Sequence, residues 1–169
     1  MRKRSWQILL LLVVIQLAAA PVPKPASAGA ANSVSEQTRC PVCGMFVFKY
    51  PNWQAQIHYE KLSETRFFDG MKDLMVFYYD PERFGAPPRE AIKDIFVKDY
   101  YSLSWISAKE AFFVTGSDVY GPMGHEFIPF ATREAAESFS TDHHGREILT
   151  FDKIPPELVE SLRAGQRMR

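Results

Sequence analysis

The sequence lacks the common signatures of catalysis. It has no glycine-rich phosphate loop, no G-x-S-x-G motif and no recognisable Ser/His/Asp constellation. Net charge is also absent, since 20 Lys and Arg residues balance 20 Asp and Glu residues. Residues 1–28 hold four basic residues and no acidic one, so the other 141 residues carry 16 basic against 20 acidic side chains, a charge of −4. We therefore expect no nucleic acid among its partners.

Long apolar runs are scarce too. The single run, Trp6 to Ala20, follows the basic residues 2–4 and precedes a possible cleavage site at residues 26–28 (residues 18–20 offer a second). Its 15 residues are short for a spanning helix and typical of an export signal. The alternative is an uncleaved signal that anchors the chain in the membrane, and either way we expect the folded part outside the cytoplasm. No cysteine directly follows the run, so a lipid anchor at that point is not expected.

The rest of the chain has ample material for one core, because 46% of all residues are hydrophobic and 14% aromatic. We predict a signal peptide (1–28), a linker rich in Pro, Ala and Ser (29–39) and one domain (40–169). The domain divides into halves at about 40–104 and 105–169.

Each half shows the same order of expected elements: strand, strand, helix, strand. In the first half the strands are 53–60, 65–68 and 92–100, joined by a polar turn at 61–64 and a helix that Asp69 is placed to cap. In the second half Thr132 caps the helix and the strands are 111–115, 126–130 and 146–151. Pro129 suggests an edge strand, and Pro155-Pro156 opens a last helix. The predicted fold is α+β, two ββαβ units sharing one core, with a C-terminal helix.

Cysteine is limited to Cys40 and Cys43, a single C-x-x-C. This pair could form a structural or catalytic disulfide, half of a zinc site, or a site for a soft metal. Residues 44–48 resemble a strand, whereas a thioredoxin-like enzyme places a helix after its C-x-x-C. A second C-x-x-C is absent, so zinc would need histidines from elsewhere.

Two methionines favour the soft metal. In an extended chain Met45 would point to the same side as Cys43, and a thiolate beside a thioether favours Cu(I). The Gly- and Pro-containing loop 120–125 repeats this spacing with Met123 and His125, although a tight turn with incidental Met and His is the alternative. The candidate metal ligands are thus Cys43, Met45, Met123, His125 and Cys40. His58 is expected on the solvated polar face of its strand, with Gln54, Gln56 and Glu60, and His143-His144 in a surface turn.

Several motifs together resemble the NosL family, over about residues 40–152. They are Cys40-Pro41-Val42-Cys43-Gly44-Met45, Phe67-Phe68-Asp69-Gly70-Met71-Lys72-Asp73, Gly116-Ser117-Asp118-Val119-Tyr120-Gly121-Pro122-Met123-Gly124-His125, Pro129-Phe130-Ala131 and Leu149-Thr150-Phe151-Asp152. NosL proteins are accessory proteins of nitrous-oxide reductase in denitrifying bacteria. The resemblance implies a periplasmic Cu(I) metallochaperone for the reductase's copper–sulfide centre, with two ββαβ halves related to treble clefs and to the organomercurial lyase. It also implies that the five candidate residues bind the copper. Many members are lipoproteins anchored through a cysteine at the end of the signal, which this chain lacks there.

We therefore expect a binding protein and not an enzyme. A copper donor would load it with Cu(I), and a copper-accepting protein, expected to be nitrous-oxide reductase, would remove the ion by ligand exchange. The main alternative is a periplasmic thiol–disulfide oxidoreductase that uses Cys40 and Cys43. A site that cleaves carbon–metal bonds rests on the lyase-like fold alone.

Overall fold

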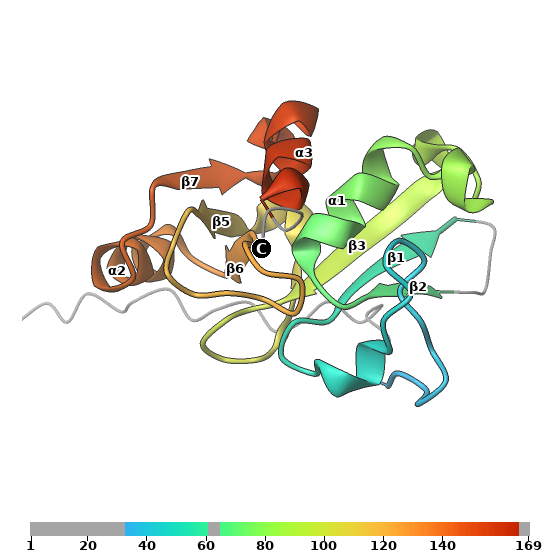
Figure 1. Cartoon of the computed structure of the whole chain (residues 1–169), viewed down its shortest axis with the longest axis horizontal. Coiled ribbons are helices and arrows are strands. Elements are labelled where there is room, and N and C mark those ends of the chain that lie inside the picture. The colour runs from blue at the N-terminus through green and yellow to red at the C-terminus, as the bar shows by residue number, and fades with distance from the viewer. Residues whose placement is uncertain (1–32, 61–64, 166–169) are drawn as a thin grey trace, which may run out of the picture.

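The computed structural model describes residues 33–60 and 65–165 (Figure 1). The expected signal peptide, the start of the linker and the predicted turn at 61–64 lie outside the described residues. Within the described part of the chain, no helix has both the length and the apolar character needed to cross a membrane.

The first half forms a four-stranded antiparallel sheet in the order β2-β1-β3-β4. Its strands are β1 (Ala55–Tyr59), β2 (Thr65–Phe68), β3 (Ile92–Lys98) and β4 (Trp105–Ser107). Helix α1 (Met71–Tyr79) follows β2 and packs against β1 and β2. The sequence predicted every strand and the α-helix of this half except β4, which lies just beyond the predicted end of the half at residue 104. Because β4 has only three residues, it is too short to show a hydrophobic period.

The second half repeats the arrangement with three strands in the order β6-β5-β7. These are β5 (Phe112–Thr115), β6 (Ile128–Phe130) and β7 (Glu147–Thr150), and α2 (Arg133–Asp142) packs against all three. Thr132 caps α2, since its side chain accepts a hydrogen bond from the Ala135 N–H. Pro129 lies in an edge strand as expected. The predicted α+β fold of two ββαβ units is confirmed.

The two halves meet in a common apolar core. Helix α3 (Pro156–Ala164) packs beside α1, which places the last described helix against the first half (Figure 1). The larger cluster of buried apolar side chains includes Phe77 of the first half and Phe113, Phe127 and Val159 of the second. A smaller cluster lies under α2. Short 3₁₀ helices complete the chain at Val47–Lys49, Glu82–Phe84, Arg89–Ala91, Ala108–Glu110 and Phe151–Lys153.

Strand β1 is more buried than its sequence pattern predicted. The alternation of apolar and polar residues suggested that Gln56 and His58 face solvent, yet Gln56 is fully buried. Its partners across the sheet are Phe67 of β2 and Phe96 of β3, and these large side chains flank it on the same face. The expectation of a solvated polar face was therefore wrong at Gln56.

Candidate metal centre

The C-x-x-C lies in a tight turn that leads into a 3₁₀ helix. The Gly44 N–H donates to the Cys40 carbonyl at 2.9 Å, and the Cys40 N–H donates to the Met45 carbonyl at the same distance. Gly44 has a φ of +78°, in the left-handed region that glycine adopts without strain. The predicted strand at 44–48 is therefore wrong, and so is the argument that an extended chain aligns the side chains of Cys43 and Met45.

Two aspartates of the α1 segment lie against the two cysteines. The Cys43 Sγ is 3.3 Å from Asp69 Oδ1, and the Cys40 Sγ is 3.5 Å from Asp73 Oδ2. One potential ligand atom from each of the four residues lies within 4.8 Å of all the others. The two cysteines are not joined by a disulfide. Four side chains from two distant segments thus form a compact set of metal donors.

Asp69 does not cap α1, contrary to the sequence-based prediction. The N-cap residue is Gly70, which has no side chain that could accept a hydrogen bond from the helix. The helix begins one residue later than a capping Asp69 requires, so the carboxylate is free to face Cys43 instead. Asp69 thus lies just before the helix and Asp73 in its first turn, and each carboxylate contacts one of the two cysteines.

The surroundings of Cys40 and Asp73 disfavour negative charge. The pKa of the Cys40 thiol is raised by its hydrogen bond with Cys43, by burial and by the nearby Asp73 and Asp69. Burial likewise raises the pKa of Asp73. A cation between these groups would stabilise their deprotonated forms, and metal binding would release protons. Sulfur ligands restrict such a site to soft or borderline ions, Cu(I) among them.

The second predicted cluster lies in a tight turn. Gly121 and Gly124 exchange backbone hydrogen bonds of 2.8 and 3.1 Å, which leaves Pro122 and Met123 at the tip. Gly124 is left-handed, with a φ of +87°. The expected extended backbone is therefore wrong here and a tight turn takes its place, while the role of Met123 and His125 as ligands stays a prediction. His125 follows the turn, with its ring centroid 4.8 Å from that of Tyr120.

Both clusters meet the first turn of α1. Asp69 and Asp73 contact the cysteines, whereas Lys72, between them, donates from Nζ to the carbonyls of Met123 and His125 at 2.8 Å each. The structure therefore brings the two predicted segments to one end of one helix. That Met45, Met123 and His125 complete a single coordination sphere with the cysteines stays a prediction.

Sequence reasoning missed four polar residues around this helix end: Asp69 and Asp73 as potential ligands, and Lys72 and Glu126 as buried partners. Burial raises the pKa of Glu126 to about 8 and lowers the pKa of Lys72, while their opposite charges counteract both shifts. The spacing of Asp69 and Asp73 was a visible signal. The pairing of residues 72 and 126 was not, because they lie far apart in the chain.

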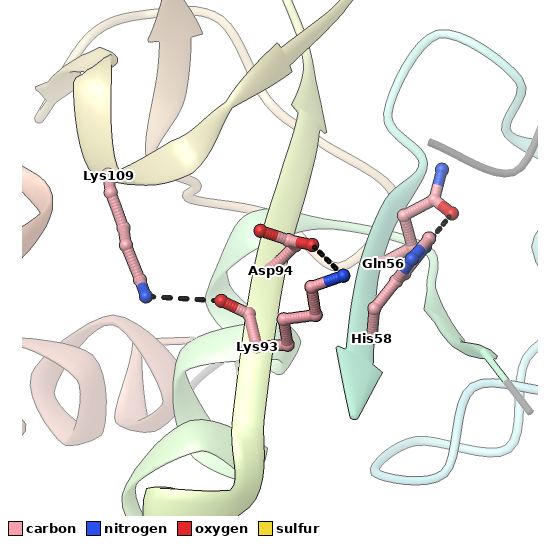
Figure 2. A network of polar contacts seen from close by, with 5 residues as sticks. All are labelled: Gln56, His58, Lys93, Asp94 and Lys109. Atoms are coloured by element: carbon pink, nitrogen blue, oxygen red, sulfur yellow. Dashed lines mark hydrogen bonds and ion pairs between the residues drawn. The ribbon is translucent and has the colours of Figure 1, made fainter. Parts of the chain in front are cut away.

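The remaining histidines lie elsewhere. The Nε2 of His58 is 2.8 Å from the Gln56 Oε1, and the nearby Lys93 and Asp94 pair on β3 (Figure 2). His143 lies between α2 and β7, and its Nδ1 is 3.0 Å from the Oδ1 of Asp118, which follows β5. Among the described residues, none of His58, His143 and His144 belongs to a group of three or more potential metal donors.

Known proteins resemble this chain in sequence and in structure. Residues 31–159 match the sequence profile of the NosL family. A curated protein of Achromobacter cycloclastes, named copper-binding lipoprotein NosL, is 28% identical over 138 residues, which cover 75% of this chain and 69% of the relative. A protein of the same name from Stutzerimonas stutzeri is 26% identical over 133 residues, which cover 74% of this chain and 66% of the relative. The chain thus spans about two thirds of the length of these relatives.

The fold has a counterpart among solved structures. The crystal structure of the copper chaperone NosL from Shewanella denitrificans superposes with a TM-score of 0.66 at 25% identity, covering 76% of this chain and 97% of that one. The family profile covers most of the chain, including the C-x-x-C, the start of α1 and the Met123–His125 loop. The chain therefore belongs to the NosL family, as its motifs predicted.

Proposed function

We propose that this protein binds Cu(I) at the end of α1 and passes it to a copper-accepting protein. One observation carries the proposal: Cys40 and Cys43 share a compact set of donors with Asp69 and Asp73, and the loop with Met123 and His125 is tied to the same helical turn. Thiolate, thioether and imidazole are ligands that suit Cu(I). The relatives named copper-binding lipoprotein and copper chaperone support a role in carrying copper.

The arrangement suits ligand exchange. Cys40 is buried, whereas Cys43, Met45, Met123 and His125 are all partly exposed. A partner docked over these residues could replace the neutral thioether and imidazole ligands one at a time before it removes the ion from the cysteine sulfurs. No bond of a substrate molecule is broken in this scheme, so the role is binding and delivery and not catalysis.

The resemblance to the NosL family motivates a proposal for the client and for the compartment. We propose the copper–sulfide centre of nitrous-oxide reductase as the destination and the periplasm as the compartment, with residues 1–28 as the export signal and 40–169 as the folded domain. The relatives named lipoproteins favour export. Their names give no support to our expectation that a lipid anchor is absent.

The ligand assignment predicts a specific loss of affinity. We expect Met123→Leu combined with His125→Ala to weaken Cu(I) binding about tenfold or more, because two of the soft ligands are removed. Anaerobic competition with a chromogenic Cu(I) chelator measures the affinity, and circular dichroism checks the fold. His144→Asn, in the exposed turn after α2, is the control and should bind as the wild type does. Unchanged affinity of the double variant would refute these two ligands.

The competing function, thiol–disulfide exchange by Cys40 and Cys43, lacks the structural feature that activates such pairs. The C-x-x-C leads into the 3₁₀ helix at Val47–Lys49, and a reactive pair needs a stabilised thiolate. Here the hydrogen bond with Cys43, burial and the nearby Asp73 and Asp69 instead raise the pKa of Cys40. Reduction of insulin that persists after loss of Met45, Met123 and His125 would favour the oxidoreductase over the copper chaperone.

A further inference from the structure

The N-terminus of α1 is capped by a side chain of the other half. Gly70, the N-cap residue, has no side chain with which to accept a hydrogen bond. Instead the Glu126 Oε1 accepts from the Lys72 N–H at 2.5 Å, and also from the Phe127 N–H at 2.9 Å. Glu126 is only 4% exposed, so this carboxyl group replaces a local cap at a buried helix end.

Gly70 and Gly121 leave the room that Glu126 occupies. A Cβ atom on Gly70 would lie 2.2 Å from the Glu126 Oε2, and a Cβ on Gly121 would lie 3.0 Å from the Glu126 Cγ. The φ of Gly70 is −167°, which any residue adopts, so the glycine is needed for space and not for its backbone angle. The carboxyl group of Glu126 is thus enclosed between the start of α1 and the start of the Gly121–Gly124 turn.

Whereas Glu126 reaches from the second half to α1, the side chain of Lys72 reaches from α1 to the Gly121–Gly124 turn. Its side chain is fully buried, and its Nζ donates to the carbonyls of Met123 and His125, on the two sides of the left-handed Gly124. These bonds fix the peptide groups from which both side chains project. The turn's own hydrogen bonds join Gly121 to Gly124 but do not connect the turn to α1.

We propose that Lys72 and Glu126 form a reciprocal clamp that positions Met123 and His125 for the copper ion held at Cys43. The inference rests on the proposed function and extends it to two positioning residues. Glu126 fixes the helix end that carries Asp69 and Asp73, and Lys72 fixes the turn that carries the second pair of ligands. A thioether is a weak ligand, so its contribution depends on being held in place before the ion arrives.

The test compares Lys72→Met with Lys72→Arg. Methionine fills much of the same space but donates no hydrogen bond, whereas arginine keeps the donors. Lys98→Met is the matched control, because the half-buried Lys98 also donates to a backbone carbonyl, that of Leu103 at 3.1 Å. Each variant is titrated with Cu(I) under anaerobic conditions. Chelator competition gives the affinity, the ultraviolet thiolate-to-Cu(I) absorption reports the cysteines, and the methyl NMR signal of Met123 reports the turn.

We expect Lys72→Met to bind Cu(I) about tenfold more weakly or worse. It should keep the thiolate absorption and lose the copper-induced shift of the Met123 methyl signal. Lys72→Arg should recover that shift, and Lys98→Met should match the wild type. If Lys72→Met does not fold, Lys72→Gln, whose amide ends short of the loop, is held to the same expectation. A folded Lys72→Met or Lys72→Gln variant with wild-type affinity and the Met123 shift would overturn the clamp.

The wild-type titration separates this inference from the proposed function. Absence of the thiolate absorption in the wild type would overturn copper binding itself and the clamp with it. A wild type that shows both signals, together with a folded Lys72 variant that behaves identically, would overturn the clamp alone.

Discussion

The close approach of Glu126 to Gly70 predicts that a single methyl group will be strongly destabilising. In Gly70→Ala the new Cβ would lie 2.2 Å from the Glu126 Oε2, and ordinary contact begins at 3.4 Å, so the carboxyl group must retreat by about 1.2 Å. Its Oε1 then loses the N–H groups of Lys72 and Phe127. A buried N–H without its acceptor costs about 1–3 kcal/mol, so we expect a loss of about 2–4 kcal/mol in the free energy of unfolding.

Urea denaturation followed by tryptophan fluorescence measures this loss. Gly165→Ala is the control, because its Cβ would come no closer than 3.7 Å to the surrounding atoms, and it should change stability by less than about 0.5 kcal/mol. The cause is isolated by repeating Gly70→Ala in a Glu126→Ala background, where the methyl group meets no carboxyl group. The loss should then shrink to about 1 kcal/mol or less, which is the cost of alanine in place of glycine at an N-cap.

Two results would refute the reasoning. One is a loss below about 0.5 kcal/mol for Gly70→Ala in the wild-type background. The other is an equal loss in both backgrounds, since the effect would then arise from the helix itself and not from Glu126.

The remaining predictions concern single groups. Iodoacetamide should alkylate Cys43 about tenfold faster than Cys40, whose thiol is buried and has a raised pKa, and equal rates by mass spectrometry would contradict this. Burial lowers the pKa of His58, so this histidine binds a proton more readily in the unfolded chain than in the folded one. The stability of the wild type relative to His58→Asn should therefore fall as the pH drops below 6.5. A stability difference that does not change with pH would contradict this prediction. Thr132→Ala should cost about 1 kcal/mol in urea denaturation, because α2 loses its cap.

The sequence predicted most elements of the fold because their signals are local. Apolar spacing and turn residues give the strands and helices of both ββαβ units, and Thr132 and Pro129 give a cap and an edge. Features that depend on contacts between residues far apart in the sequence were missed. Gln56 is buried because Phe67 and Phe96 lie on neighbouring strands, which the alternation within β1 does not reveal.

The candidate site was likewise predicted only in part, where its signals are local in the sequence. Cys40 and Cys43 stand out by their spacing, and the family motifs point to Met123 and His125. Asp69 was predicted to cap the helix because a carboxylate before a helix normally has that role. Here Glu126 supplies the acceptor instead, and it lies 54 residues beyond Lys72, whose N–H group it binds. Only the fold shows that one helix end serves both clusters.

The shared apolar core has a consequence for the molecule as a whole. Because Phe77 of one half and Phe113, Phe127 and Val159 of the other belong to one cluster, a truncation between the halves would leave a bare apolar face on each fragment. The two repeats therefore form a single cooperative unit in spite of their separate sheets. An exchange of one half between relatives would succeed only if the facing side chains were exchanged with it.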